Sequence, residues 1–264
     1  MKGDSILQHD IILKVSDISM AYHTVDKETL AIENVSFDVR RGEFFSIVGP
    51  SGCGKSTLLS IISGLLKPES GSIIIDDQPV SGSNPKIGYM LQRDHLFEWR
   101  NILQNVLLGL EVQHKLNKKT KEHAIELLDT YGLYDFKYNY PNQLSGGMRQ
   151  KVALIRTLAI DPEVLLLDEP FSSLDYQTRL YISDEVYNII QKERKTAILV
   201  THDISEAVSM SDRVMVLSHR PATVKNIYDI VLSGDTHSAI GKRTAPEFRE
   251  YFNMIWKELD IHES

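Results

Sequence analysis

The sequence predicts an α/β fold with a mostly parallel core sheet, an antiparallel β region near the N-terminus and a helical subdomain. Three observations support this fold class. Strand-like and helical patterns alternate along most of the chain, one strand-like run leads through a glycine-rich turn into a helix, and the run Val164–Leu167 is apolar without alternation. Such a run is typical of a parallel strand covered on both faces. Because 264 residues suffice for one large domain, we expect a single domain over residues 1–264.

The first third of the chain is expected to consist mainly of strands. β-branched and aromatic residues predict strands at Ile11–Val15, Val35–Val39 and Phe44–Val48, with polar turns between them. Apolar residues at helical spacing then predict a helix over Ser56–Leu66, which a following Lys-Pro pair ends. Two further strands are predicted on either side of a turn rich in Gly, Ser, Asn and Pro, at Ser72–Asp76 and Lys86–Met90.

The middle of the chain is predicted to be helical. Apolar residues recur at i, i+3, i+4 and i+7 within Asn101–Tyr131, and Gly132 follows where a helix commonly ends. We therefore place a helical subdomain at about residues 94–146, followed by a helix from Ser145 to Ile160. Beyond Val164–Leu167 the β/α alternation continues, which implies right-handed crossovers and a doubly wound sheet. Its predicted elements are Thr178–Lys192 (helix), Ala197–Thr201 (strand), Ile204–Met210 (helix) and Arg213–Leu217 (strand).

The C-terminal part, residues 218–264, is predicted to form a hairpin and an amphipathic helix over Pro246–Asp260. Six apolar residues are expected on one face of that helix: Phe248, Tyr251, Phe252, Ile255, Trp256 and Leu259. We expect this face to dock on the chain's own domain. The alternative is a regulatory or partner surface.

Composition excludes several classes of function. The 29 Lys and Arg against 36 Asp and Glu give a formal charge of −7, so the chain lacks the overall basic field that holds a protein on nucleic acid, and we expect no nucleic-acid partner. Cys53 is the one cysteine and fits a reducing compartment. Charges within Met1–Asp10 argue against a signal peptide. No apolar run reaches the ~18 to 20 residues of a membrane span, so a membrane role would need a partner.

The clearest motif is a glycine-rich loop between the predicted strand Phe44–Val48 and the helix from Ser56. It matches G-x-x-x-x-G-K-[ST], and we call it the P-loop; its residues are Gly49, Pro50, Ser51, Gly52, Cys53, Gly54, Lys55, Ser56 and Thr57. Glycines let backbone N–H groups surround phosphate oxygens at a helix N-terminus, whose partial charge favours anions. Lys55 is expected to contact the β- and γ-phosphates and Ser56 to ligate Mg²⁺. Cys53 is expected to fill space in the loop.

Two adjacent carboxylates are expected to complete the site. Asp168 and Glu169 follow the apolar run Val164–Leu167 directly and precede a proline. Asp168 is predicted to hold Mg²⁺, and Glu169, one residue further on, to polarise an attacking water. The alternative, a strand that simply ends in solvated acids, is disfavoured by the P-loop upstream.

A second glycine-rich helix start, Leu144–Met148 (LSGGM), lacks a lysine of its own. Within one site it would duplicate the P-loop, so we expect Ser145, Gly146 and Gly147 to cap the nucleotide bound by another copy of the chain. With this motif the sequence resembles the ATP-binding subunit of an ATP-binding cassette (ABC) transporter, whose signature is usually written LSGGQ. We call Leu144–Met148 the signature loop. Met148 stands in place of the family's Gln, while the three phosphate-facing residues are intact.

The resemblance runs from about Ile11 to Leu217 and assigns four further residues to the nucleotide site. Tyr22 resembles the aromatic residue that stacks on adenine, although a packed tyrosine at a strand end is the alternative. Gln92 resembles the Q-loop glutamine that reaches Mg²⁺. Asp175, in Ser172–Asp175, resembles part of the D-loop that crosses a dimer interface. His202 resembles the switch histidine that contacts the γ-phosphate.

The segment from Gln92 to Trp99 is expected to receive the membrane partner. Leu96, Phe97 and Trp99 are large apolar residues in a predicted loop, where such residues need a reason. In the resembled family this region forms the groove for a permease; the alternative is packing against the helical subdomain. The Leu-Phe-x-Trp-Arg pattern together with LSGGM most resembles the branch that imports nitrate, sulfonates, taurine or a pyrimidine precursor of thiamine.

The resemblance therefore implies an ATPase that dimerises around two ATP molecules with Mg²⁺ and drives solute import through a separate permease and, indirectly, a solute-binding protein. It implies a peripheral location on the cytoplasmic face of the cell membrane. Two alternatives belong to other classes. A soluble ABC ATPase acting on nucleic acid or ribosomes would carry coiled-coil insertions or a second cassette, which the sequence lacks. A P-loop kinase would leave the signature loop without a purpose.

Overall fold

A computed structural model describes residues 11–23, 28–234 and 238–260. The segment Met1–Asp10, whose charges argue against a signal peptide, lies outside the described residues. The strands are β1 (Ile11–His23), β2 (Glu28–Arg40), β3 (Phe44–Val48), β4 (Ser70–Ile75), β5 (Gln78–Pro79), β6 (Ile87–Met90), β7 (Val164–Asp168), β8 (Thr196–Val200), β9 (Arg213–Leu217) and β10 (Val224–Asp229). The α-helices are α1 (Lys55–Ile62), α2 (Ile102–Val112), α3 (Lys118–Thr130), α4 (Gly146–Leu158), α5 (Tyr176–Lys192), α6 (Ile204–Met210), α7 (Ala239–Lys242) and α8 (Pro246–Asp260).

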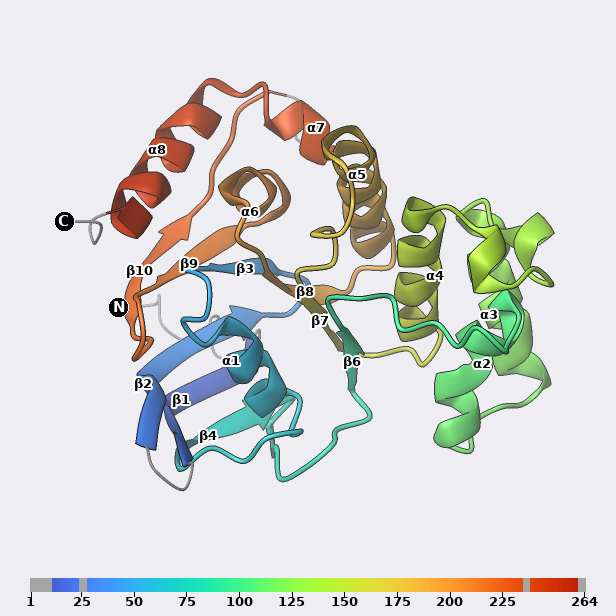
Figure 1. Cartoon of the computed structure of the whole chain (residues 1–264), viewed down its shortest axis with the longest axis horizontal. Helices are drawn as coiled ribbons and strands as arrows, with labels where there is room; N and C mark the ends of the chain where they lie inside the picture. Colours follow the sequence, from blue (N-terminus) through green and yellow to red (C-terminus); the bar gives the residue numbers. More distant parts are fainter. Residues whose placement is uncertain (1–10, 24–27, 235–237, 261–264) are drawn as a thin grey trace, which may run out of the picture.

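The central sheet has the strand order β10-β9-β3-β8-β7-β6 and lies at the middle of the molecule (Figure 1). Its neighbouring strands pair in parallel except at β10, which pairs antiparallel with β9. The order places β3, which precedes the P-loop, next to β8 and one strand away from β7. Because parallel strands end at the same edge, the loops after β3, β7 and β8 meet there. The predicted mostly parallel core sheet is confirmed.

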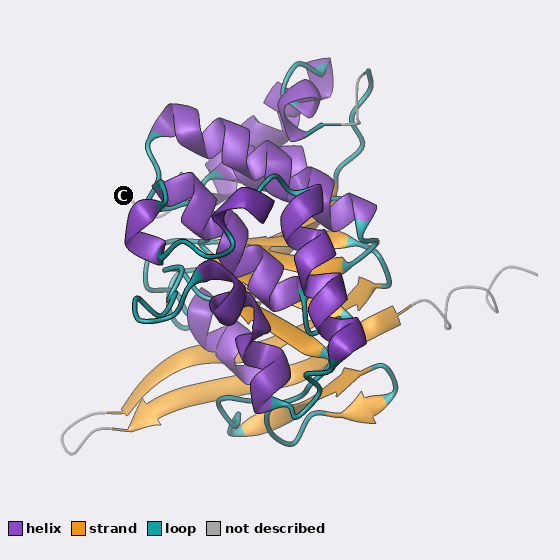
Figure 2. Cartoon of the chain, turned by 90° about the vertical axis from the view of Figure 1, so that its right-hand side faces the viewer, coloured by secondary structure: helices purple, strands orange, loops and turns teal. Residues whose placement is uncertain are grey.

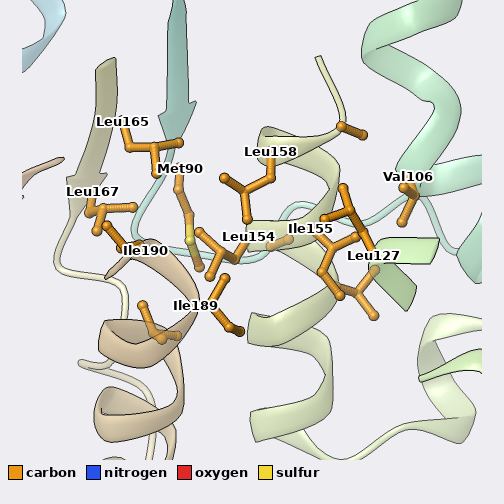
Figure 3. Close-up of a cluster of buried hydrophobic side chains, with 14 of the residues drawn as sticks. Met90, Val106, Leu127, Leu154, Ile155, Leu158, Leu165, Leu167, Ile189 and Ile190 are labelled. Atoms are coloured by element: carbon orange, nitrogen blue, oxygen red, sulfur yellow. The ribbon is translucent and has the colours of Figure 1, made fainter. Parts of the chain in front are cut away.

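The two faces of this sheet bury two different cores. On β7, Leu165 and Leu167 belong to one cluster, whereas Val164 and Leu166 belong to the other. Alternate residues of a strand point to opposite faces, so the apolar run covers both. One core contains α2 to α5, with α4 lying between α5 and the α2–α3 pair (Figure 3). The other contains α1 and the antiparallel sheet.

The second sheet, β2-β1-β4-β5, is antiparallel and confirms the predicted antiparallel region (Figure 2). Its first two strands are longer than predicted, 13 residues each, because pairing continues through polar positions. Register shifts interrupt the β1–β2 pairing, for example between Val15 and Ile18. Such irregularities break the period-2 pattern on which the prediction depended.

The helix after the P-loop ends earlier than predicted, at Ile62 rather than Leu66. Gly64 has a φ of +76° and its N–H donates to the Ile61 carbonyl, while the Leu65 N–H donates to the Ser60 carbonyl. A Cβ on Gly64 would lie 2.0 Å from the Gly82 carbonyl oxygen. The left-handed Gly64, directly after the C-cap Ser63, therefore ends this helix, and the close approach of Gly82 requires a glycine there.

The predicted helical stretch Asn101–Tyr131 contains two helices, α2 and α3. Asn101 caps α2 and Asn117 caps α3, each by accepting a hydrogen bond from the backbone N–H three residues later. The second asparagine marks a new helix start inside the apolar pattern, which the apolar spacing alone does not reveal.

The C-terminal helix α8 packs against α6 and β9, as expected for docking on its own domain. Ile255 is fully buried there, and four other predicted residues are partly buried against the same cluster. Trp256 was wrongly placed on this face: its exposed fraction is 51%, and it stacks on Phe252 with ring centroids 6.2 Å apart. Adjacent helix residues are about 100° apart, so the face that buries Ile255 turns Trp256 outward. Within the described parts of the chain, no helix is both long and apolar enough to cross a membrane.

Candidate functional site

The P-loop connects the end of β3 to the start of α1. Lys55 is buried, and its Nζ donates to the carbonyl oxygens of Gly49 (2.8 Å) and Pro50 (2.9 Å). These bonds hold the ammonium group over the loop. Gly54 is the N-cap of α1 and supplies no side-chain hydrogen bond, and the first turn carries no acidic residue. The N–H groups that open α1 therefore remain available to an anion.

The glycines of the P-loop are required for different reasons. Gly54 has a φ of +128°, and a Cβ there would lie 3.2 Å from both the Ala31 carbonyl oxygen and Ile32. A side chain at this position would be strained and crowded. Gly52 has a φ of +71°, and its carbonyl accepts a hydrogen bond from the Arg220 guanidinium at 2.5 Å.

The remaining P-loop side chains separate into buried and exposed groups. Cys53 is buried in the core below the loop, where burial raises the pKa of its thiol, so it fills space rather than presenting a thiolate. Ser51 is exposed. Thr57 Oγ1 lies 3.0 Å from the hydroxyl of Tyr22, a residue of β1 with an exposed fraction of 40%. Tyr22 therefore lies beside the P-loop with part of its surface open.

The end of β7 brings Asp168 to the start of α1. The Ser56 hydroxyl donates to Asp168 Oδ1 at 3.0 Å, which joins two residues that are 112 positions apart in the sequence. Burial raises the pKa of Asp168, and the hydrogen bond from Ser56 opposes that shift. Tyr89, on β6, also contacts Asp168, through its hydroxyl at 3.4 Å from Oδ2, and burial raises the Tyr89 pKa to about 12. Sequence reasoning missed Tyr89, because no motif surrounds it and its proximity depends on the pairing of β6 with β7.

Glu169 lies at the centre of a small polar cluster. Its Oε2 is 3.2 Å from His202 Nδ1 and 3.4 Å from Gln92 Nε2, and Gln92 also contacts the Ser172 hydroxyl at 3.4 Å. The backbone of Glu169 is left-handed, with a φ of +45°, and its N–H donates to the Val200 carbonyl at 2.8 Å. This left-handed backbone turns the chain directly after β7, a conformation that other turns of the described chain also adopt.

The structure thus gathers Lys55, Ser56, Asp168, Glu169 and His202 at the carboxyl edge of the central sheet. The Gln92 amide nitrogen contacts Glu169 rather than the Ser56–Asp168 pair that was predicted to share a metal with it. Among the described residues, no three His, Cys, Asp or Glu side chains form a cluster able to hold a metal ion. The hydroxyl and carboxylate oxygens of Ser56 and Asp168 are hard donors that suit Mg²⁺, which commonly shares few protein ligands with substrate phosphates.

The signature loop opens α4. Ser145 caps this helix by accepting a hydrogen bond from the Met148 N–H at 3.3 Å, and the serine itself is exposed. A Cβ on Gly147 would lie 2.8 Å from Ile182 Cδ1 of α5. Gly147 is therefore closely packed against α5 on the side where a side chain would lie, and Gly146 is half-buried.

Asp175 caps α5 by accepting a hydrogen bond from the Thr178 N–H at 3.1 Å. Hydrogen bonding to Thr178, from its side chain first and its backbone N–H second, lowers the pKa of the exposed carboxyl group. Within one chain Asp175 therefore has a structural partner of its own, and the structure shows no contact of Asp175 with the other described site residues.

In the loop from Gln92 to Trp99, part of the apolar surface packs against the helical subdomain and part is exposed. Leu96 is buried in the core shared with α2 to α5, so the expectation that it belongs to an exposed docking surface is wrong. Phe97 is half-buried and stacks on Trp99 with ring centroids 4.7 Å apart. Trp99 has an exposed fraction of 74%. One apolar residue anchors the loop, and another is presented at the surface.

Comparisons with known proteins agree with this geometry. The family model described as "ABC transporter" matches residues 32–172. The chain is 45% identical to an uncharacterized ABC transporter ATP-binding protein, YtlC, of Bacillus subtilis, over 94% of this chain and 95% of that protein. It is 39% identical to the nitrate import ATP-binding protein NrtD of Synechocystis sp., over 92% of this chain and 93% of that protein.

A solved structure shows the same fold. The dimeric post-hydrolysis state of the ATP-binding cassette MJ0796, bound to ADP and Pi, superposes with a TM-score of 0.71 at 31% sequence identity. The match covers 83% of this chain and 99% of that chain. The predicted resemblance is confirmed: the chain belongs to the ABC transporter family and is an ATP-binding subunit of that family, a P-loop ATPase.

Proposed function

We propose that two copies of this chain enclose two ATP molecules and use their hydrolysis to drive solute import through a separate permease. Each ATP lies between Gly49–Thr57 of one copy and Ser145–Gly147 of the other. Closure of the two copies moves the permease, and hydrolysis lets the copies separate again. Each chain then contributes half of each ATP site.

The arrangement of the two glycine-rich loops carries this proposal. The helix that the P-loop opens, α1, packs in the core on one face of the central sheet, and α4, which the signature loop opens, packs in the core on the other face. Strands β6 to β8 separate the two helices (Figure 1). Two anion-binding helix starts held apart in this way suit two different nucleotides. The dimeric form of the MJ0796 cassette supports the same arrangement.

The P-loop residues bind and orient the triphosphate. Lys55 is already held over the loop by the Gly49 and Pro50 carbonyls, so it contacts the β- and γ-phosphates with little reorganisation. Ser56 and Asp168 would hold Mg²⁺, with Gln92 able to turn toward it from its contact with Glu169. When bound, the ion neutralises charge that develops on the phosphate oxygens. Tyr22, partly exposed beside Thr57, is placed to stack on adenine.

Glu169 acts as the general base in this proposal. His202 and Gln92 both contact Oε2, so Oε1 is the oxygen that can accept a proton from the attacking water. The bond between the Glu169 N–H and Val200 fixes the backbone that carries the carboxylate. His202, half exposed at the end of β8, holds the γ-phosphate while Glu169 activates the water.

The permease is proposed to contact the loop from Gln92 to Trp99. Burial of Leu96 fixes the loop on the helical core, and the stacked Phe97–Trp99 pair presents an aromatic surface. Because Gln92 lies in the same loop and contacts Glu169, movement of the loop would shift the contact of the proposed base. Binding to a permease would place the chain peripherally on the cytoplasmic face of the membrane, where it would also act indirectly on a solute-binding protein.

The proposed cargo is a small solute of the nitrate, sulfonate or taurine kind, or a pyrimidine precursor of thiamine. Similarity to a nitrate import ATP-binding protein over nearly the full chain supports this class. The test is to isolate the membrane complex and ask which of these solutes, delivered with its binding protein, stimulates ATP hydrolysis. Stimulation by none of them would contradict the cargo class and leave the ATPase proposal standing.

The dimer proposal is tested by hydrolysis and by Glu169→Gln. ATPase activity per chain should rise with protein concentration, because half-sites combine only in the dimer. Glu169→Gln should bind ATP normally, stop turnover and form an ATP-dependent dimer visible by gel filtration with light scattering; Glu163→Gln, an exposed acid before β7, is the control. Specific activity that is constant down to dilute protein would contradict the shared site. Co-migration with ribosomes rather than membranes would favour a soluble ABC ATPase instead.

A further inference from the structure

Arg179 lies on the first turns of α5, directly after the D-loop (Ser172–Asp175). Its Nη2 donates to the Leu174 carbonyl at 3.0 Å, so the guanidinium holds the D-loop backbone. The side chain is mostly buried, with an exposed fraction of 23%. A buried arginine normally uses its donors fully, since each unsatisfied donor costs free energy.

The other side of the guanidinium faces the loop that carries His202. Arg179 Nη1 is 3.8 Å from Asp203 Oδ2, and Nε is 4.0 Å from Glu206 Oε1. These separations allow ion pairing but exceed the range of a charge-assisted hydrogen bond. Nε is buried and has no hydrogen-bond partner among the described residues. Arg179 thus makes one hydrogen bond to the D-loop and leaves two longer contacts that a small movement could shorten.

The carboxylates that face Arg179 also fix the backbone on both sides of His202. The Thr201 hydroxyl donates to Glu206 Oε2 at 2.6 Å, and it accepts from the Asp203 N–H at 3.0 Å. Asp203 Oδ1 in turn caps α6 by accepting from the Ser205 N–H at 2.8 Å. His202 lies between these two anchored residues, and its Nδ1 is 3.2 Å from Glu169 Oε2.

From this geometry we infer that Arg179 is a positioning residue that joins the D-loop to the His202 loop, so that the position of one sets the position of the other. The inference rests on the proposed roles of Glu169 and His202 in hydrolysis. When a second copy presses on the D-loop, the Leu174 carbonyl and Arg179 move together, and the contacts with Asp203 and Glu206 close. His202 then reaches its working position only when the dimer is formed.

Glu206 gives the connection a pH dependence. Burial, followed by the nearby charge of Asp203, raises its pKa to about 7, and the Thr201 hydrogen bond, Arg179 and Arg243 act in the opposite direction. Below that pH the carboxyl is protonated and attracts Arg179 less. Turnover that depends on Arg179 should therefore increase as the pH rises through the Glu206 pKa.

The test measures kcat, KM for ATP and the pH profile of the purified full chain. Arg179→Gln should lower kcat about 10- to 100-fold, as expected for misplacement of a catalytic group, and change KM by less than about threefold, because ATP binding is not involved. Arg179→Lys keeps the charge but not the planar guanidinium group, so its kcat should lie between those of the unchanged chain and Arg179→Gln. Arg249→Gln, which removes an exposed arginine of α8, is the charge-matched control.

The pH profile separates positioning from simple destabilisation. In Arg179→Gln the increase of kcat with pH through the Glu206 pKa should disappear, because the arginine that the ionised Glu206 attracts is lost. In Glu206→Gln the increase of kcat with pH should likewise flatten. The double variant Arg179→Gln, Glu206→Gln should lose no more kcat than Arg179→Gln alone. If Arg179→Gln or Arg179→Lys keeps the control's kcat and profile while Glu169→Gln is inactive, Arg179 has no positioning role. Normal turnover by Glu169→Gln would instead overturn the proposed function, and this inference with it.

Discussion

The P-loop and the signature loop are both glycine-rich turns that open a helix, but the chain completes them differently. At the P-loop, Gly54 leaves the start of α1 without a side-chain cap, and Lys55 is held over the loop by two carbonyls. At the signature loop, Ser145 caps α4 itself, and Gly147 is packed against Ile182. One loop is prepared to receive an anion from within its own chain. The other is mainly fixed to its own helix pair.

The comparison also separates two uses of glycine. In the P-loop, Gly54 is required by its left-handed backbone and by the approach of the Ala31 carbonyl. In the signature loop, Gly147 has no unusual φ, and a side chain is excluded by its neighbour on α5. Changes at the two loops should therefore differ in kind: the P-loop should lose ligand binding, and the signature loop should lose packing or assembly.

The largest expected effect is at Lys55. Lys55→Ala removes a buried cation that the P-loop holds ready, so ATP hydrolysis should fall by at least about 100-fold, as for loss of one preorganised transition-state donor. Release of phosphate would measure hydrolysis, and binding of a fluorescent ATP analogue would measure nucleotide affinity. Lys119→Ala, at an exposed position on α3, should leave both unchanged. Normal hydrolysis by Lys55→Ala would remove the P-loop from the proposed site.

A smaller effect is expected from Gly54→Ala, with Gly42→Ala as a matched control. Both glycines have positive φ values, +128° and +75°, but a Cβ at Gly42 meets nothing within 4 Å. Each change should cost roughly 1 kcal/mol of unfolding free energy through backbone strain, and crowding against Ala31 and Ile32 should add to this cost at Gly54. Only Gly54→Ala should also weaken ATP binding, by about tenfold for each 1.4 kcal/mol of further strain in the bound loop. Equal ATP affinities in the two variants would show that the loop's shape does not depend on Gly54.

Gly147→Ala tests whether the signature loop depends on packing. The new Cβ would press on Ile182, and overpacking of this kind costs about 1–3 kcal/mol in unfolding free energy. Removing the obstructing atoms with Ile182→Ala in the same chain should recover part of that loss, so the two changes should be non-additive in a urea denaturation cycle. Additive losses would mean that Gly147 is required for some other reason.

The smallest effect on the nucleotide site of a single chain is expected from Ser145→Ala. Loss of an N-cap serine costs about 1 kcal/mol of helix stability. Because the P-loop of the same chain is intact, ATP affinity of the dilute chain should not change, whereas the ATP-dependent dimer seen with Glu169→Gln should weaken. A reduced ATP affinity at low protein concentration would place Ser145 at the nucleotide of its own chain.

Much of the site could be predicted because its chemistry is contiguous in sequence. Asp168 and Glu169 end an apolar run whose lack of alternation identifies a buried parallel strand, and the P-loop is defined by nine adjacent residues. The order of β/α elements is likewise local, because periodicity is set by neighbours along the chain. These features predicted the fold class and the family.

The errors occurred where distant segments meet. Leu96 is buried because α2 to α5 close over it. Tyr89 reaches Asp168 only through the pairing of β6 with β7. In the same way, no local pattern indicates that Gly147 packs on Ile182. Each of these depends on strand order and helix packing, which local patterns in the sequence do not reveal.

The sequence by itself determined which residues can cradle phosphate, carry the carboxylates and open the two helices, because those properties follow from residue type and local spacing. Only the tertiary structure decided how they are arranged. The connections between strands place α1 and α4 on opposite faces of the central sheet. Folding also brings Ser56 to Asp168 and places Arg179 between the D-loop and the His202 loop. Such contacts are fixed by the order in which strands pair and by which face each helix covers, and the chain satisfies those conditions only when it is folded as a whole.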